Sequence, residues 1–151
     1  MREETRIAAF SISGWDTHAS QANGLPRALR DLSEAILTSK AGPGPVWDKT
    51  AVLCLTEFGR RVGENGSRGT DHGTSGAAIF AGGTVKGQKV MTDWPGLASG
   101  DLYKDRDLMP TEDIRRYLAW AMHALFPIGR SRQENDVFSQ LEMDANPGQI
   151  A

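Results

Sequence analysis

In the first part of the chain, two short apolar runs lie on either side of a stretch whose apolar residues recur on one face of a helix. Residues 6–12 (Arg-Ile-Ala-Ala-Phe-Ser-Ile) and 50–55 (Thr-Ala-Val-Leu-Cys-Leu) barely alternate with polar residues, which is typical of strands buried on both faces of a parallel sheet. Between them lies a predicted helix, and Pro26 suits its first turn. Its apolar stripe consists of Leu25, Leu29, Leu32 and Ile36. This order predicts a right-handed βαβ unit with two parallel strands.

The second half of the chain continues the same pattern. Residues 77–81 predict a third strand, and residues 85–90 are compatible with a hairpin arm around Gly87. A clear helix is predicted from Thr111, as N-cap, to Pro127, and a weaker one over residues 134–143. The apolar face of the clear helix holds Ile114, Tyr117, Leu118, Ala121, Met122 and Leu125. The pattern therefore predicts an α/β fold, with a mainly parallel sheet flanked by helices.

Composition narrows the class of protein. The 151 residues fit one domain, predicted over residues 1–145, with a frayed tail at 146–151. The net charge of −2 leaves no basic surplus for a nucleic-acid partner, and no apolar run approaches the roughly 20 residues of a membrane span. The N-terminus is charged and lacks an apolar h-region, so we expect no signal peptide on this chain. A single cysteine, Cys54, excludes an internal disulfide framework and is interpreted as inert core.

Potential metal ligands follow both predicted strands of the βαβ unit. Asp16 and His18 come after the first strand, and Glu57 comes after the second. Parallel strands bring these ends to one sheet edge, where the glycine-rich loop 59–76 can fold His72 over them. Asp16 and His18 are two residues apart, so both point to one side of an extended segment. Two imidazoles and a carboxylate suit zinc, whereas a carboxylate-richer shell suits manganese, magnesium or calcium.

Each of these residues also has an ordinary structural interpretation. An Asp and a His after a strand are often a hydrogen-bonded capping pair. Arg60 and Arg61 could bind a phosphate or sulfate, or they could be solvated loop charges. His123 lies opposite the apolar stripe of its helix and is predicted to be a solvated surface residue.

Several motifs in order resemble the DUF1501 family over about residues 7–126. They are Gly14-Trp-Asp-Thr-His18, Thr56-Glu-Phe-Gly-Arg60, Glu64-Asn-Gly66, Gly69-Thr-Asp-His-Gly73, Gly82-Gly-Thr-Val-Lys-Gly87, Trp94-Pro-Gly-Leu97 and Thr111-x-Asp113-x-Arg115. DUF1501 proteins look like members of the alkaline phosphatase and sulfatase superfamily. The resemblance therefore implies a partial alkaline phosphatase-like fold, and a hydrolase that cleaves phosphate or sulfate esters at a metal centre.

The resemblance also implies roles for individual residues. Asp16, His18 and His72 correspond to ligands of one metal ion, and Glu57 corresponds to a ligand of a second. Glu57 is followed by Phe58, which cannot ligate, where relatives usually carry Asp followed by His or Asn. The chain resembles only the C-terminal part of the family, without the portion that carries the nucleophile. Ester turnover is therefore expected to be weak or absent.

Two further expectations concern the role and the partners of the chain. The alternative to a hydrolase is a non-catalytic binding or assembly module that retains the fold. A parallel sheet without its first strands exposes an edge, which predicts a homodimer or larger homo-oligomer. The localisation stays open, because full-length relatives look exported to the periplasm while this chain shows no signal.

Overall fold

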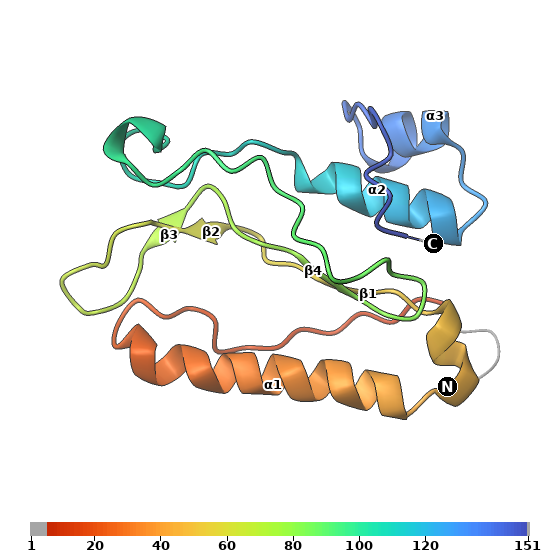
Figure 1. The fold of residues 1–151 in the computed structure, drawn as a ribbon, viewed down its shortest axis with the longest axis horizontal. Helices are drawn as coiled ribbons and strands as arrows, with labels where there is room; N and C mark the ends of the chain where they lie inside the picture. Colours follow the sequence, from red (N-terminus) through yellow and green to blue (C-terminus); the bar gives the residue numbers. More distant parts are fainter. Residues whose placement is uncertain (1–5, 151) are drawn as a thin grey trace.

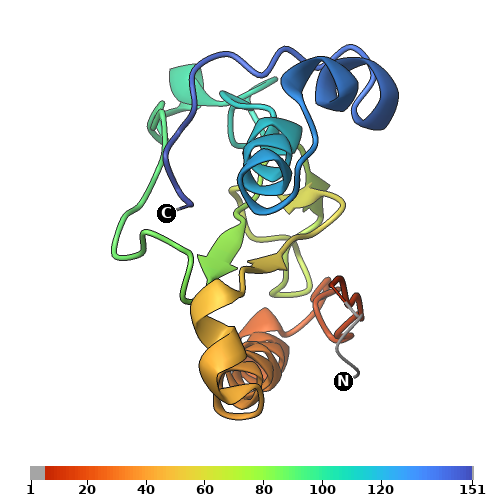
Figure 2. The same ribbon diagram turned by 90° about the vertical axis from the view of Figure 1, so that its right-hand side faces the viewer.

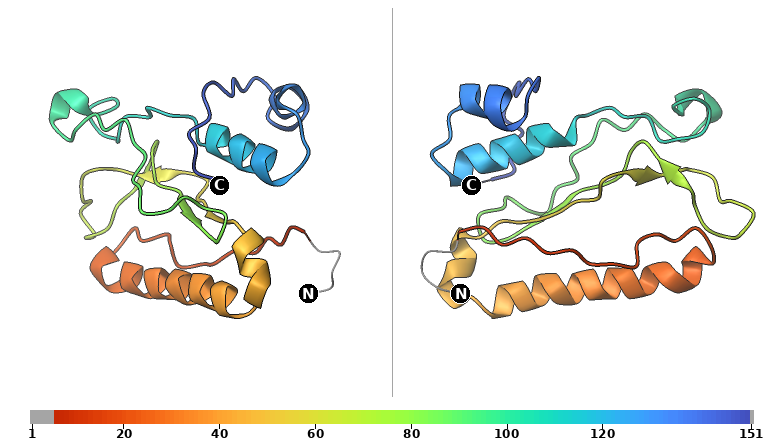
Figure 3. Two further views of the ribbon diagram at one scale, coloured as in Figure 1. Left: turned by 45° about the vertical axis from the view of Figure 1, so that its right-hand side comes forward. Right: turned by 180° about the vertical axis from the view of Figure 1, so that it is seen from behind.

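The computed structural model describes residues 6–150, which form three layers (Figure 1). The long helix α1 lies on one side of a middle layer of extended chain and short strands, and α2 and the C-terminal segments lie on the other. The view from behind gives the same order of layers (Figure 3). In chain order, the elements are α1 (Gln21–Ala41), η1 (Gly44–Lys49), β1 (Val52–Cys54), β2 (Gly59–Arg60), β3 (His72–Gly73), β4 (Ile79–Ala81), η2 (Ser99–Asp101), α2 (Ile114–Leu125), α3 (Arg130–Arg132) and η3 (Gln133–Val137).

The middle layer holds two antiparallel strand pairs, so the prediction of a mainly parallel sheet is wrong. β1 pairs with β4, and Val52 lies opposite Ala81. β2 pairs with β3, and Arg60 lies opposite His72. The chain between β1 and β4 turns back through the β2–β3 hairpin, so β4 returns in the direction opposite to β1. The glycine-rich loop thereby decides the sheet topology that the apolar runs do not encode.

The segment predicted as the first strand is extended but unpaired. Residues 6–12 belong to no strand and run alongside the middle layer before the chain enters α1 (Figure 1). Within the described part of the chain, the backbone of residues 7–13 exchanges no hydrogen bond with another segment. Neither β1 nor β4 therefore gains a parallel neighbour, and the predicted βαβ unit does not form.

The helix α1 begins earlier than Pro26 indicates. Ser20 adopts a left-handed conformation at the N-cap, and Pro26 lies inside the helix. The backbone nitrogens of Ser20 and Gln21 donate to the carbonyls of Ser67 and Arg68, at 2.9 and 2.8 Å. These loop carbonyls satisfy donors that a helix N-terminus leaves free, so the first turn forms ahead of the proline. The inward stripe centres on buried Ala28, whereas Leu29 is 49% exposed.

The C-terminal part contains the hydrophobic core cluster of the described residues. Buried Ala119 of α2 packs with Leu141 and Met143, and Trp120 and Phe138 contact this group. The Trp120 Nε1–H donates to the carbonyl of Met143 at 2.6 Å. The helix predicted over 134–143 is replaced by α3, η3 and an irregular segment. Leu141 and Met143 are therefore core residues that lie on a segment without helix or strand.

Three further features complete the fold. The N-cap of α2 is Asp113 rather than Thr111, and its carboxylate accepts from the Arg115 backbone nitrogen at 2.9 Å. Gln149 is buried, and its side chain donates to the Tyr117 carbonyl at 2.8 Å. Within residues 6–150, no helix is both long enough and apolar enough to cross a membrane.

Candidate metal centre

Asp16, His18 and His72 converge at one end of the middle layer. The Nε2 atoms of His18 and His72 lie 3.1 Å apart, and each lies 3.0 Å from Oδ1 of Asp16. His18 is half-buried, whereas Asp16 and His72 are exposed. The three potential ligand atoms thus form a nearly equilateral triangle that solvent can reach.

Backbone hydrogen bonds from the glycine-rich loop bring the two histidines together. The Thr70 nitrogen donates to the Thr17 carbonyl at 3.2 Å, beside the contacts of Ser67 and Arg68 with the start of α1. Gly69 is the point of closest approach, because a Cβ atom there would overlap the backbone of Thr17 and His18. This close approach places His72, on β3, next to a residue more than fifty positions earlier.

A carboxylate on the same loop fixes the orientation of the His18 ring. Asp71 Oδ1 lies 3.2 Å from His18 Nδ1 and accepts from Asn65 Nδ2 at 2.9 Å. Asn65 Nδ2 also donates to the His18 carbonyl at 2.9 Å. With Nδ1 held by a carboxylate, Nε2 is left to face Asp16 and His72. Metal-binding histidines are commonly oriented in this way.

Arg60 holds the carboxylate of the cluster. Its guanidinium donates to the carbonyls of Thr70 and Trp15, at 2.8 and 2.7 Å, and to Asp16 Oδ1 at 2.8 Å. These bonds occupy the fork of Arg60, so it positions Asp16 from behind. Hydrogen bonds from His72 and then Arg60 hold the pKa of Asp16 below its ordinary value.

The remaining predicted site residues lie outside the triangle. Glu57 is exposed, and its carboxylate is absent from the group of converging ligand atoms found in residues 6–150. Its neighbour Phe58 instead stacks on the His72 ring, with 3.9 Å between centroids. Arg61 Nη1 lies 3.6 Å from Asp71 Oδ2. Hydrogen bonds from Asn65 and then His18 hold the pKa of Asp71 low.

The donor set fits a divalent metal ion. Two neutral imidazoles and a carboxylate form a known zinc first shell that leaves a fourth position open. Tetrahedral zinc with ligands at about 2.05 Å has ligand–ligand edges of about 3.3 Å, slightly longer than the edges of this triangle. Octahedral ions at about 2.1 Å have edges of about 3.0 Å. The geometry therefore accommodates either coordination, while the imidazoles favour zinc over magnesium or calcium.

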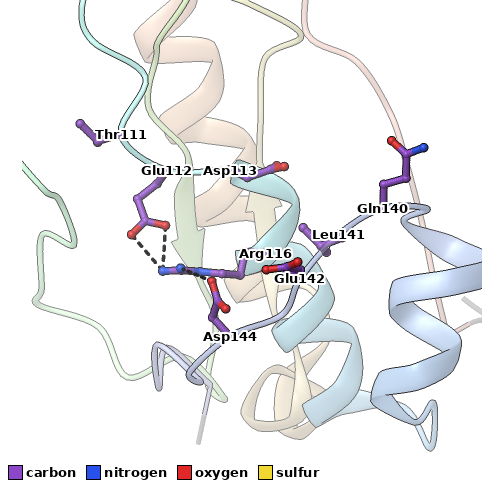
Figure 4. A pocket seen from close by; sticks show the side chains of 8 residues that line it. All are labelled: Thr111, Glu112, Asp113, Arg116, Gln140, Leu141, Glu142 and Asp144. Atoms are coloured by element: carbon purple, nitrogen blue, oxygen red, sulfur yellow. Dashed lines mark hydrogen bonds and ion pairs between the residues drawn. The ribbon is translucent and has the colours of Figure 1, made fainter.

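A separate polar hollow lies at the start of α2 and does not include the triangle. Its volume is about 400 Å³, and it lies between the first turn of α2 and residues 140–144 (Figure 4). Arg116 crosses it and pairs with Glu112 at 2.7 Å and with Asp144 at 3.4 Å. Because its central cation is already neutralised by two carboxylates, this hollow offers no free charge for an anionic substrate.

Sequence reasoning did not assign the supporting roles of Asp71 and Asn65. Asp71 directly precedes His72, and Asn65 lies in an Asn-Gly pair that is typical of turns. Asn65 Oδ1 accepts from the backbone nitrogens of Ser67 and Gly69, at 2.9 and 3.1 Å. The turn signal locates the bend, but nothing in the local sequence shows that the same side chain reaches His18.

Comparison with known proteins gives a match to one family model. A family model described as "Protein of unknown function (DUF1501)" matches residues 1–137. No curated protein and no solved structure matches the chain.

Proposed function

The chain belongs to the DUF1501 family, and from the geometry of its site we propose that it binds one divalent metal ion through Asp16, His18 and His72. The observation that carries the proposal is the convergence of three ligand atoms within 3.1 Å of one another. The carboxylate of Asp71 on the far nitrogen of His18 supports it, because a simple capping pair needs no such orientation.

Zinc is the ion that this donor set favours, with manganese, magnesium and calcium as competitors. When bound, such an ion supplies Lewis-acid chemistry that polarises the oxygen of an ester. Arg60 holds Asp16, and Asp71 holds His18, so both ligands are oriented before an ion arrives. Exposed His72 completes the set of ligands from β3, which pairs with the strand that carries Arg60.

The substrate class we propose is a small phosphate or sulfate ester, as the likeness to the alkaline phosphatase and sulfatase superfamily implies. Two hydroxyls of the glycine-rich loop are already engaged: Thr70 donates to Gln21 Oε1, and Thr74 donates to the Leu108 carbonyl, both at 2.9 Å. Neither hydroxyl contacts a general base. We therefore expect turnover by this chain alone to be weak or absent.

The second candidate function is a non-catalytic binding or assembly module. The observation that favours it is the exposure of large apolar side chains, including Trp94 at 58%. Such side chains are typical of surfaces that contact another molecule. A module of this kind requires no ion at the triangle, so metal content separates the two functions.

The test is equilibrium dialysis of the purified chain against zinc, manganese, magnesium and calcium in turn, followed by elemental analysis. We expect about one equivalent of zinc in the wild type. His18→Ala and His72→Ala should each lose it, because two remaining ligands hold zinc far more weakly.

His123→Ala is the matched control. His123 is exposed, its Nδ1 donates to the Ile128 carbonyl at 2.8 Å, and its ring lies edge-on to Trp120. Its loss should leave the metal content unchanged. Equal metal content in all four proteins, or none in the wild type after zinc is added, would overturn the proposed metal site and favour the non-catalytic module.

A further inference from the structure

The accessible surface of this chain is far larger than that of a compact monomer. It amounts to 10628 Å² for a mass of 16.4 kDa. A folded monomer of this mass exposes about 7,500 Å², so the excess is about 3,100 Å². A standard interface buries about 800 Å² per partner, and obligate dimers bury 2,000–5,000 Å² in total, as an order of magnitude. The excess is therefore large enough for a permanent dimer.

Residues 7–13, here called the edge segment, are a stretch of chain on this surface that belongs to no strand. The segment is extended, and its backbone makes no hydrogen bond to another segment of the described chain. Ile7 is 69% exposed and Phe10 is 70% exposed. Seen end-on, the edge segment lies at the outer side of the molecule, beside α1 (Figure 2).

The edge segment has none of the features that normally prevent edge-to-edge pairing. It contains no Lys, no Pro and no charged residue. A two-fold axis through such a segment places it antiparallel to its own copy, and no like charges then face each other. Its small residues, Ala8, Ala9, Ser11 and Ser13, allow two backbones to approach closely.

We propose that the edge segment pairs antiparallel with the edge segment of a second copy of this chain, which gives a two-fold symmetric dimer. The pairing satisfies backbone groups of the edge segment that the other described residues leave open. It also brings the exposed side chains of Ile7 and Phe10 next to the second copy, and it covers part of the excess surface. The two metal sites lie outside the paired segments, so the dimer forms with or without bound metal.

The first measurement is the mass of the full chain by sedimentation equilibrium, from about 1 to about 100 μM. We expect twice 16.4 kDa over most of this range. The double variant Ala9→Pro, Phe10→Lys should give a monomer with an unchanged circular dichroism spectrum, because proline removes a ladder donor and lysine places charge at the edge. Val90→Lys, at a residue that is 91% exposed elsewhere, should stay dimeric.

A cysteine scan tests the pairing itself without relying on a disruptive variant. Cysteine is introduced singly at each position from residue 7 to residue 13, in a Cys54→Ser background, and oxidised with copper–phenanthroline. Equivalent residues of an antiparallel pair separate by about 6.6 Å for each position away from the two-fold axis. A disulfide needs Cα atoms within about 7 Å, so only one position, or two adjacent positions in the scan, should cross-link efficiently.

Val90→Cys in the same background is the control for chance collisions and should not cross-link. A monomer at every concentration would overturn the proposal, as would equal cross-linking at all positions from 7 to 13 and at position 90. A dimer that survives the double variant and shows no cross-linking in the edge segment would place the interface elsewhere. A monomer that associates only with a different protein would show that the occupant is not a second copy.

Discussion

Nδ1 of His18 lies 3.2 Å from Oδ1 of Asp71, while Nε2 of the same ring lies 3.0 Å from Asp16. The ring is thus held between two carboxylates with different roles. Asp71 is anchored by Asn65 and Arg61, whereas Asp16 faces His72. This arrangement makes Asp71 an orienting group for a ligand, and it gives the candidate metal centre a supporting layer.

Asp71→Asn should weaken zinc binding by about 10- to 100-fold, the usual effect of losing such a supporting group. The neutral amide no longer stabilises a proton on His18 Nδ1, so the ring is less often presented with Nε2 free. Competition titration against a zinc indicator measures the change. Asp93→Asn, at an exposed carboxylate elsewhere, serves as the control. Equal zinc affinities for the wild type and Asp71→Asn would show that Asp71 does not support zinc binding.

Gly69→Ala should destabilise the chain by about 1–3 kcal/mol and reduce zinc binding as well. The added Cβ would overlap the backbone of Thr17 and His18, so the loop must move away from the triangle. Chemical denaturation and the zinc titration measure the two effects. Gly66→Ala is the matched control, because a Cβ there meets nothing within 4 Å. If both variants behave like the wild type, the loop does not dock on His18 as described.

Asp107 should make stability depend on pH in the acid range. Its carboxylate is 1% exposed and accepts two hydrogen bonds from Arg106, both at 2.9 Å, which hold its pKa below the ordinary value of 3.8. A depressed pKa in the folded state means that charged Asp107 stabilises the fold above the unfolded-state pKa. This contribution is lost as the pH falls through the folded-state pKa.

Asp107→Asn should therefore be less stable than the wild type at neutral pH, by about 1–3 kcal/mol. The difference should shrink as the pH falls from about 5 to about 2.5. Urea midpoints at a series of pH values measure it, with exposed Asp31→Asn as the control. A difference that stays constant over this range would contradict the assigned role of the Asp107 carboxylate.

The sequence predicts which residues form the triangle better than it predicts how the fold brings them together. Asp16 and His18 are two apart in the sequence, and both reach the triangle even though residues 6–12 pair with no strand and the backbone bends at His18. His72 reaches them through the β2–β3 hairpin rather than through a shared parallel edge. The ligand pattern is a local property of the chain, whereas the hairpin depends on contacts between distant residues.

The sheet shows why the remaining fold was not predicted. The run at residues 50–55 identifies β1, and the run at 77–81 identifies β4, but neither run shows which strand it pairs with. Strand pairing is a long-range choice, and short runs with little alternation also occur in antiparallel pairs, as β1 and β4 show. Glu57 illustrates the consequence: without the parallel edge its carboxylate stays exposed, and Phe58 contacts His72 instead.

The measurement that tests the metal centre most directly is X-ray absorption spectroscopy at the zinc edge of the zinc-loaded chain. We expect nitrogen and oxygen ligands at about 2.0–2.1 Å with the multiple-scattering signature of two imidazoles, and no bound zinc in dialysed His72→Ala. A sulfur ligand at about 2.3 Å would instead place the ion on Cys54. That result, or a spectrum unchanged in His72→Ala, would contradict a site built from Asp16, His18 and His72.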